Sequence, residues 1–176
     1  MPRLSDRVGT FTDSVIRRMT RINNQYDSIN LSQGFPDFDP PKELTDALAK
    51  AAHDGPHQYA VTFGAQNFRE ALAKKTSPAL HHEVDPNTEI CVTCGGTEAM
   101  MAAMMTICNP GDKVMVFSPF YENYGADAIL SGAEPIYIPL VPPEYEFDLS
   151  LIEKGFAEGA KAVSYTHLTL PTNREV

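Results

Sequence analysis

The sequence is short of several features that mark particular classes of protein. It has no Trp, three Cys, and 14 Lys and Arg against 23 Asp and Glu, which gives a formal net charge of −9. A nucleic-acid-binding protein needs a basic face to neutralise phosphates, and an anionic membrane surface attracts basic segments. The composition therefore predicts neither a nucleic-acid partner nor a membrane partner.

Long apolar runs are also missing. The longest strongly apolar stretch is Ala99–Cys108, whereas a helix needs about twenty apolar residues to cross a bilayer. Asp6 and Asp13 interrupt the arginines near the N-terminus, which disfavours an organelle transit peptide. An odd number of Cys without a signal peptide predicts a reducing compartment and a cytoplasmic location.

The residues that are present suit one globular domain. The chain has 176 residues and is 43% hydrophobic, which is enough to bury a sizeable core. The first ten residues show no periodicity and predict an extended arm. A helix is expected next, capped by Thr12 or Asp13, because apolar residues recur at helical spacing at Val15, Ile16, Met19 and Ile22.

Proline and glycine divide the next part of the chain. Three prolines and a glycine make residues 33–41 a shaped loop, and Asp39 is expected to begin a helix. That helix is expected to end at Gly55-Pro56, and a shorter helix is expected over residues 67–75. Asp37 and Asp39 are interpreted as turn and capping residues rather than as paired catalytic carboxylates.

From residue 90 onward, strand and helix patterns alternate. Strands are expected over residues 90–93, 114–117, 135–138 and 161–163, and helices over 97–108, 121–130 and 149–156. Such alternation predicts an α/β fold, a three-layer αβα arrangement whose mainly parallel sheet is covered by helices on both faces.

The segment Thr93–Ala99 is the richest local motif, because a strand is expected to run into a helix through Gly95 and Gly96. The first turn of such a helix offers unpaired N–H groups and the positive end of the helix dipole, and the Thr97 hydroxyl adds a donor, so the turn suits a phosphate. A tight turn without a ligand is the alternative. The sequence has no G-x-G-x-x-G and no Lys after the glycines, which disfavours a dinucleotide fold or a P-loop.

A second motif, Ser118–Tyr124, is expected at the carboxyl end of a strand, the edge of a parallel sheet where ligands bind. An aromatic side chain there can stack on a planar ligand. Alternatively, the aromatic residues Phe120, Tyr121 and Tyr124 cover the sheet as core residues, which we expect for at least one of them.

Cys and His residues give no metal site. Cys91 and Cys94 form a CxxC, but zinc needs four ligands and Cys108 is the only other thiol of the sequence. We interpret both residues of the CxxC as small buried hydrophobic residues. His81-His82 is interpreted as part of a solvated loop.

Several segments, taken in their order along the chain, resemble the N-terminal part of class I/II aminotransferases, the fold-type I enzymes that use pyridoxal 5′-phosphate. The resemblance spans about residues 11–163 and is greatest to the kynurenine/glutamine-type, aromatic and broad aspartate-like transaminases. It implies an N-terminal arm and helix over residues 1–28 and part of the cofactor-binding large domain over 29–163. The segments that carry it are Asn30–Phe38, Gln58–Gly64, Thr93–Ala99, Asn109–Asp112 and Pro119–Tyr121.

The resemblance implies a role for each matching residue. Gly96, Thr97 and Glu98 would hold the cofactor phosphate, and Tyr121 would stack on the pyridine ring. The substrates implied are an amino acid and a 2-oxo acid. Three further positions match the family: Tyr59 reaches the phosphate of the neighbouring subunit in a homodimer, Gly34 lies beside the substrate carboxylate, and Ile16 lies near the substrate side chain.

The family's later residues do not follow Lys161–Val163. These are an asparagine, an aspartate, the lysine that forms the Schiff base and an arginine, and none of the lysines in this sequence has the family's Ser-x-x-Lys setting. Residues 164–176 resemble translated sequencing-adapter sequence. We therefore expect a fragment cut at about Val163 that carries no catalytic residue and is inactive alone.

Two other functions remain open. The same half could belong to a C–S β-lyase that uses the same cofactor. It could also be a non-catalytic aminotransferase-like module, such as the effector domain of a transcriptional regulator. A basic helix-turn-helix segment would precede such a module, whereas the family's own arm begins here within about ten residues.

Overall fold

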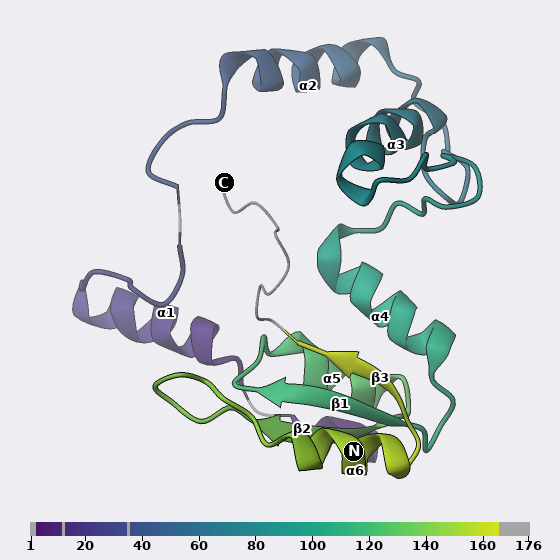
Figure 1. Cartoon of the computed structure of the whole chain (residues 1–176). Coiled ribbons are helices and arrows are strands. Elements are labelled where there is room, and N and C mark those ends of the chain that lie inside the picture. The colour runs from purple at the N-terminus through teal and green to yellow at the C-terminus, as the bar shows by residue number, and fades with distance from the viewer. Residues whose placement is uncertain (1–2, 12, 35, 166–176) are drawn as a thin grey trace. The chain divides into compact units, whose positions relative to one another are not determined.

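The structure is a computed structural model that describes residues 3–11, 13–34 and 36–165 (Figure 1). These residues form two compact units. One contains the described residues up to Phe11 together with those from Cys94 onward, and the other is Asp13–Thr93. Among the described residues, no helix has both the length and the apolarity needed to span a membrane.

The first unit is built on a parallel sheet of three strands. These are β1 (Lys113–Ser118), β2 (Glu134–Pro139) and β3 (Ala160–Ser164), in the order β2-β1-β3. The central strand pairs on both sides, so that Met115 lies beside Ile136 and Val163. The parallel sheet and these three strands are confirmed.

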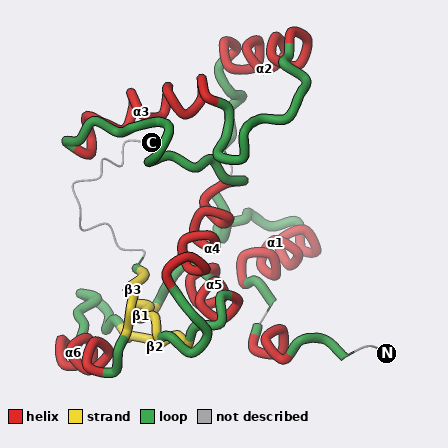
Figure 2. The backbone as a smooth tube through the Cα atoms, turned by 90° about the vertical axis from the view of Figure 1, so that its right-hand side faces the viewer, coloured by secondary structure: helices red, strands yellow, loops and turns green. Residues whose placement is uncertain are grey.

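Helices cover both faces of this sheet, as predicted (Figure 2). They are α4 (Gly95–Ile107) and α5 (Asn123–Leu130) on one side and α6 (Leu149–Ala157) on the other. Because successive side chains of a strand point to opposite faces, Val114 and Val116 pack in one cluster with Met104 and Ala128. Met115 points the other way, toward α6.

The prediction of a strand over residues 90–93 is wrong. Val92 donates a single backbone hydrogen bond to the carbonyl of Phe63, 3.0 Å away, and the segment joins no sheet among the described residues. Both edges of β1 are already paired with β2 and β3. Without neighbours to cover it, the segment leaves Cys91 and Cys94 exposed, contrary to the prediction that they are buried.

The N-terminal arm also differs from the prediction of an extended chain. Residues Asp6–Thr10 form a short 3₁₀ helix, η1. The Arg7 guanidinium donates a hydrogen bond to the carbonyl of Leu130 at the end of α5, with an Nη1–O distance of 3.2 Å. This contact attaches η1 to the first unit, which the sequence pattern alone does not indicate.

The second unit contains α1 (Val15–Tyr26), α2 (Lys42–Asp54) and α3 (Gln66–Leu80). Helix α1 is capped by Ser14, whose side chain accepts from the backbone N–H of Arg17, rather than by Asp13. The other predicted cap, Thr12, lies outside the described residues.

Two helices of this unit begin or end differently from the prediction. Helix α2 begins at Lys42 rather than next to Asp39, because a residue before a proline avoids helical backbone angles and both Asp39 and Pro40 precede one. It ends at Gly55, as predicted. Helix α3 continues past residue 75 through Pro78 to Leu80.

The last described residues extend β3. Ser164 pairs with Val116, and the ring of Tyr165 lies 6.5 Å from that of Phe117 between centroids. Residues 166–176, most of the segment that resembles adapter sequence, lie outside the described residues.

Candidate functional site

The predicted phosphate turn is the first turn of α4. The helix begins at Gly95, two residues before the predicted start, and the backbone of Gly95 has a positive φ of 80° that glycine adopts readily. Gly96 and Thr97 therefore belong to the first helical turn. Backbone N–H groups in that turn lack acceptors one turn earlier and lie at the positive end of the helix dipole, so they attract anions.

The Thr97 side chain is held by a residue that the sequence gives no reason to single out. The side-chain amide of Asn123 donates from Nδ2 to Oγ1 of Thr97 over 2.8 Å. Asn123 is the first residue of α5, so this bond joins the beginnings of two helices that are neighbours in the first unit. No motif pairs residues 26 positions apart, so sequence inspection could not find this contact.

The carboxylate of Glu98 turns back to the start of its own helix. Its Oε2 accepts a hydrogen bond from the backbone N–H of Cys94, the residue that precedes α4. An acidic side chain in this position stabilises the helix start. Glu98 thus acts through its side chain on the protein backbone.

Three aromatic residues follow β1, and they divide into two kinds. Phe120 stacks on Tyr137 with ring centroids 5.3 Å apart, and both Phe120 and Tyr124 pack against the core cluster. Tyr121 remains 46% exposed, and its ring meets that of Tyr124 edge to face at 5.9 Å. The prediction that at least one of the three is a core residue is confirmed, while the ring of Tyr121 remains partly exposed.

The other predicted site residues belong to the second unit. Ile16 is partly buried in α1, and Gly34 lies in an exposed loop. Tyr59 is fully accessible, with a relative exposure of 101%. Arg69 of α3 is buried and binds the carbonyl of Gly64, 3.0 Å from Nε, which anchors one end of the loop that carries Tyr59.

One acidic group in α5 has a perturbed titration. Asp127 lies one turn after Asn123 and is 4% exposed, and its Oδ2 atom has no hydrogen-bond partner among the described residues. Burial raises the pKa of this carboxyl above its ordinary value. At the opposite end of β1, the Lys161 ammonium binds Asp112 at 2.6 Å and lowers the pKa of that carboxyl.

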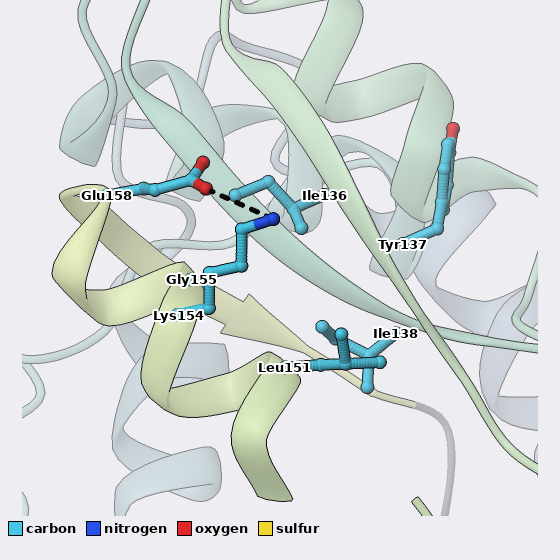
Figure 3. Close-up of a pocket in the computed structure, with 7 residues that line it drawn as sticks. All are labelled: Ile136, Tyr137, Ile138, Leu151, Lys154, Gly155 and Glu158. Atoms are coloured by element: carbon cyan, nitrogen blue, oxygen red, sulfur yellow. Dashed lines mark ion pairs between the residues drawn. The ribbon is translucent and has the colours of Figure 1, made fainter. Parts of the chain in front are cut away.

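Pockets in the described part of the chain also lie beside the sheet, and their linings contain none of the predicted site residues. A pocket of about 150 Å³ lies between α6 and β2, where Figure 3 shows Ile138 and Leu151 side by side and Lys154 paired with Glu158. This ion pair is 3.8 Å long, and the same Glu158 carboxylate also binds Lys113 at 2.7 Å. A second pocket, of about 410 Å³, is lined mainly by aromatic and aliphatic side chains near the ends of β1 and β3.

Comparison with known proteins places this geometry in a family context. The sequence profile of the family described as Aminotransferase class I and II matches residues 26–168. A methionine aminotransferase of Escherichia coli is 39% identical over 135 residues, which are 77% of this chain and 35% of that protein. A probable N-succinyldiaminopimelate aminotransferase of Mycobacterium tuberculosis is 34% identical over 143 residues, 81% of this chain and 36% of that protein.

Solved structures give the same result for the fold. YbdL from Escherichia coli, reported with a methionine aminotransferase function, superposes with a TM-score of 0.84 and 34% identity. The match covers 93% of this chain and 43% of that one. The chain thus spans about a third of the length of the curated relatives that it matches.

Proposed function

The chain belongs to the class I and II aminotransferase family, and we propose that it is the part of an aminotransferase that anchors pyridoxal 5′-phosphate. The whole enzyme would transfer an amino group between an amino acid and a 2-oxo acid. When bound, the cofactor supplies an aromatic ring that accepts the electrons of the bond broken beside the amino group. The residues of this chain hold that group in place.

One observation carries the proposal. The accessible ring of Tyr121 lies two residues before Asn123, and Asn123 is hydrogen-bonded to Thr97 in the first turn of α4 over 2.8 Å. A phosphate-binding turn and a stacking surface are thereby joined in one unit. This arrangement suits a ligand that has a phosphate at one end and a flat ring at the other.

Within this site, the residues of α4 would bind the phosphate. Gly96 and Thr97 would offer backbone N–H groups, and Thr97 would add its hydroxyl. Because the carboxylate of Glu98 already accepts from the Cys94 N–H, Glu98 would support the phosphate by fixing the turn rather than by contacting the anion with its side chain. Tyr121 would stack on the ring.

The remaining contacts would come from the second unit and from a second subunit. Tyr59 would reach the phosphate bound by the other subunit of a homodimer, and its full exposure leaves the side chain accessible for that contact. Gly34 would lie beside the substrate carboxylate, and Ile16 would lie near the substrate side chain. In this proposal, residues 1–28 are the arm and first helix, and residues 29–163 are part of the large domain.

We also propose that the 176-residue chain does not catalyse transamination alone. The sequence has seven Lys residues, and none follows the Ser-x-x-Lys pattern in which the family places its cofactor-binding lysine. Phosphate anchoring and ring stacking would remain. Amino-acid-dependent conversion of a 2-oxo acid by the purified chain would contradict this part of the proposal.

The cofactor site can be tested with pyridoxamine 5′-phosphate, which binds without a covalent bond to lysine. Fluorescence titration of the chain should show tighter binding of this compound than of pyridoxamine, which lacks the phosphate. Thr97→Val should weaken binding of the phosphorylated compound by about tenfold and leave the affinity for pyridoxamine unchanged.

A matched control lies in the same helix. Thr106 donates its hydroxyl to the carbonyl of Ala102 at 2.7 Å, so Thr106→Val removes a hydroxyl from α4 without touching the proposed site. The control should bind both compounds like the original chain. Equal affinity of the original chain for the two compounds would refute the phosphate site.

A further inference from the structure

We propose that Asn123 is a positioning residue that aims the Thr97 hydroxyl at the cofactor phosphate and fixes the phosphate turn relative to the ring-stacking segment. This inference rests on the proposed function, since it assigns a task to a residue beside that site. The observation behind it is the 2.8 Å hydrogen bond from Asn123 Nδ2 to Thr97 Oγ1.

The direction of this hydrogen bond matters for an anion. A threonine hydroxyl can donate one hydrogen bond and accept others. Because the Asn123 amide donates to Thr97, the Thr97 oxygen acts as an acceptor and its own proton can be donated elsewhere. A phosphate oxygen, which accepts hydrogen bonds, is a suitable partner for that proton.

Not all helical threonines use their hydroxyl in this way. Thr20 of α1 also accepts, from the side-chain amide of Asn30 at 3.2 Å, whereas Thr45 of α2 donates to the carbonyl of Lys42 at 2.9 Å. Thr76 donates to the carbonyl of Leu72 at 2.8 Å, and Thr106 donates to that of Ala102 at 2.7 Å. In both residues the hydroxyl proton is directed back into the helix, as is common for threonine in helices. Thr97, like Thr20, is instead bound as an acceptor, but Thr97 lies in the first turn of its helix, which suits it to a ligand at the start of α4.

The same contact also constrains the ring end of the site. Asn123 begins α5, and the backbone N–H of Tyr124 donates to the carbonyl of Tyr121 at 3.0 Å, which closes the turn around Asn123. Tyr121 is therefore held within one short turn of the residue that holds Thr97. The separation of the two ends of the site depends on Asn123.

Asn123→Ala should weaken binding of pyridoxamine 5′-phosphate by about threefold to tenfold, because one donor that orients Thr97 is lost. Asn123→Asp should weaken it more, since a carboxylate accepts from the Thr97 hydroxyl, redirects its proton and repels the phosphate. Pyridoxamine should bind both variants as it binds the original chain. Asn24→Ala, an exposed asparagine of α1, is the matched control and should change neither affinity.

A double-mutant cycle distinguishes positioning from a merely structural link. In a Thr97→Val background, Asn123→Ala should cause no further loss of affinity for the phosphorylated compound, because there is no hydroxyl left to orient. Additive losses, or an equal loss for pyridoxamine, would overturn the inference. A variant that does not fold does not prevent the test, because inorganic phosphate should shift the Asn123 side-chain amide signals of the original chain in NMR spectra and leave those of Asn24 in place.

The inference and the proposed function can fail separately. If the original chain prefers the phosphorylated compound and Asn123→Ala retains that preference in full, the positioning role is wrong and the phosphate site stands. If the original chain shows no preference for the phosphorylated compound, both are wrong.

Discussion

Gly155 of α6 lies directly against the side chain of Met115 in β1. A Cβ atom on Gly155 would be 2.2 Å from Sδ and 3.0 Å from Cγ of Met115, and Met115 is fully buried. The helix can approach the central strand this closely because residue 155 has no side chain. The packing of α6 on the sheet thus depends on one glycine.

Gly155→Ala should destabilise the chain by about 1–2 kcal/mol, measured by urea unfolding. The free-energy cost of overpacking a filled core is larger than the stabilisation expected from the higher helix propensity of alanine. The sign is informative, since alanine stabilises an unobstructed helix. Met115→Val, which shortens the side chain, should recover part of the loss in the double variant. Gly9→Ala, where a Cβ would meet nothing within 4 Å, should change stability by less than about 0.5 kcal/mol.

Asp127→Ala should stabilise the chain at neutral pH by about 1–2 kcal/mol, because it removes a buried carboxylate whose Oδ2 has no hydrogen-bond partner in the described part of the chain. Burial raises the pKa of Asp127 in the folded state above its ordinary value of 3.8, so the folded chain holds this proton more tightly than the unfolded chain. The original chain therefore loses stability as the pH rises from 3.8 through the folded-state value.

The advantage of Asp127→Ala should accordingly be largest at neutral pH and should shrink in acid. Urea unfolding at several pH values measures this difference. Asp46→Ala is the matched control, because Asp46 is an exposed helical aspartate paired with Lys42 at 2.5 Å. An Asp127→Ala variant less stable than the original chain at neutral pH would contradict the expectation that burial of this carboxylate destabilises the fold.

Glu158→Gln should make thermal stability less dependent on pH in acid. Lys113 donates a hydrogen bond to Glu158 at 2.7 Å and lowers the pKa of the carboxyl below its ordinary value of 4.5. The stabilisation is therefore present above the ordinary value and is lost as the pH falls through the lower folded-state value.

The effect should be small and should diminish at high salt, because both partners are partly exposed. Melting temperatures between about pH 3 and about pH 7, at low and high salt, provide the measurement. Glu153→Gln is the control, because Glu153 is an exposed glutamate of α6, the helix that Glu158 follows directly. An unchanged pH profile for Glu158→Gln would show that the ion pair does not contribute.

Tyr121→Ala should weaken pyridoxamine 5′-phosphate binding by about tenfold, since a stacking surface is lost, whereas Tyr121→Phe should retain most of the affinity. Ligand fluorescence gives both affinities. Tyr145→Ala removes another tyrosine of similar exposure, 49% against 46%, and should leave binding unchanged. If Tyr121→Phe lost as much affinity as Tyr121→Ala, the hydroxyl of Tyr121 rather than its ring would account for the binding.

The sequence predicts the sheet well where local pattern and tertiary environment agree. The apolar run of β1 and the glycine that ends α2 are local signals, and both are confirmed. The segment over residues 90–93 has the same apolar character, but strand formation needs an adjacent strand, and none pairs with it among the described residues. Strand pairing depends on the whole fold, so the apolar composition of this segment predicts a strand that does not form.

The end of α3 is another difference between prediction and structure. Proline usually ends a helix, yet α3 continues through Pro78, and Thr76 and Ser77 donate to backbone carbonyls one turn earlier. At the site, the family resemblance identifies Thr97 and Tyr121, whereas the contact with Asn123 depends on how α4 and α5 pack. Contacts between distant positions are determined by tertiary structure.

The strand order β2-β1-β3 has a consequence for biosynthesis. β1 is made first, and its first neighbour follows after one short helix. Its other edge is covered only when β3 has been added at the end of the described chain. At translation speeds of about 5–20 residues per second, the most apolar strand stays half-paired for seconds on the ribosome, a period in which a chaperone would find an open edge to bind.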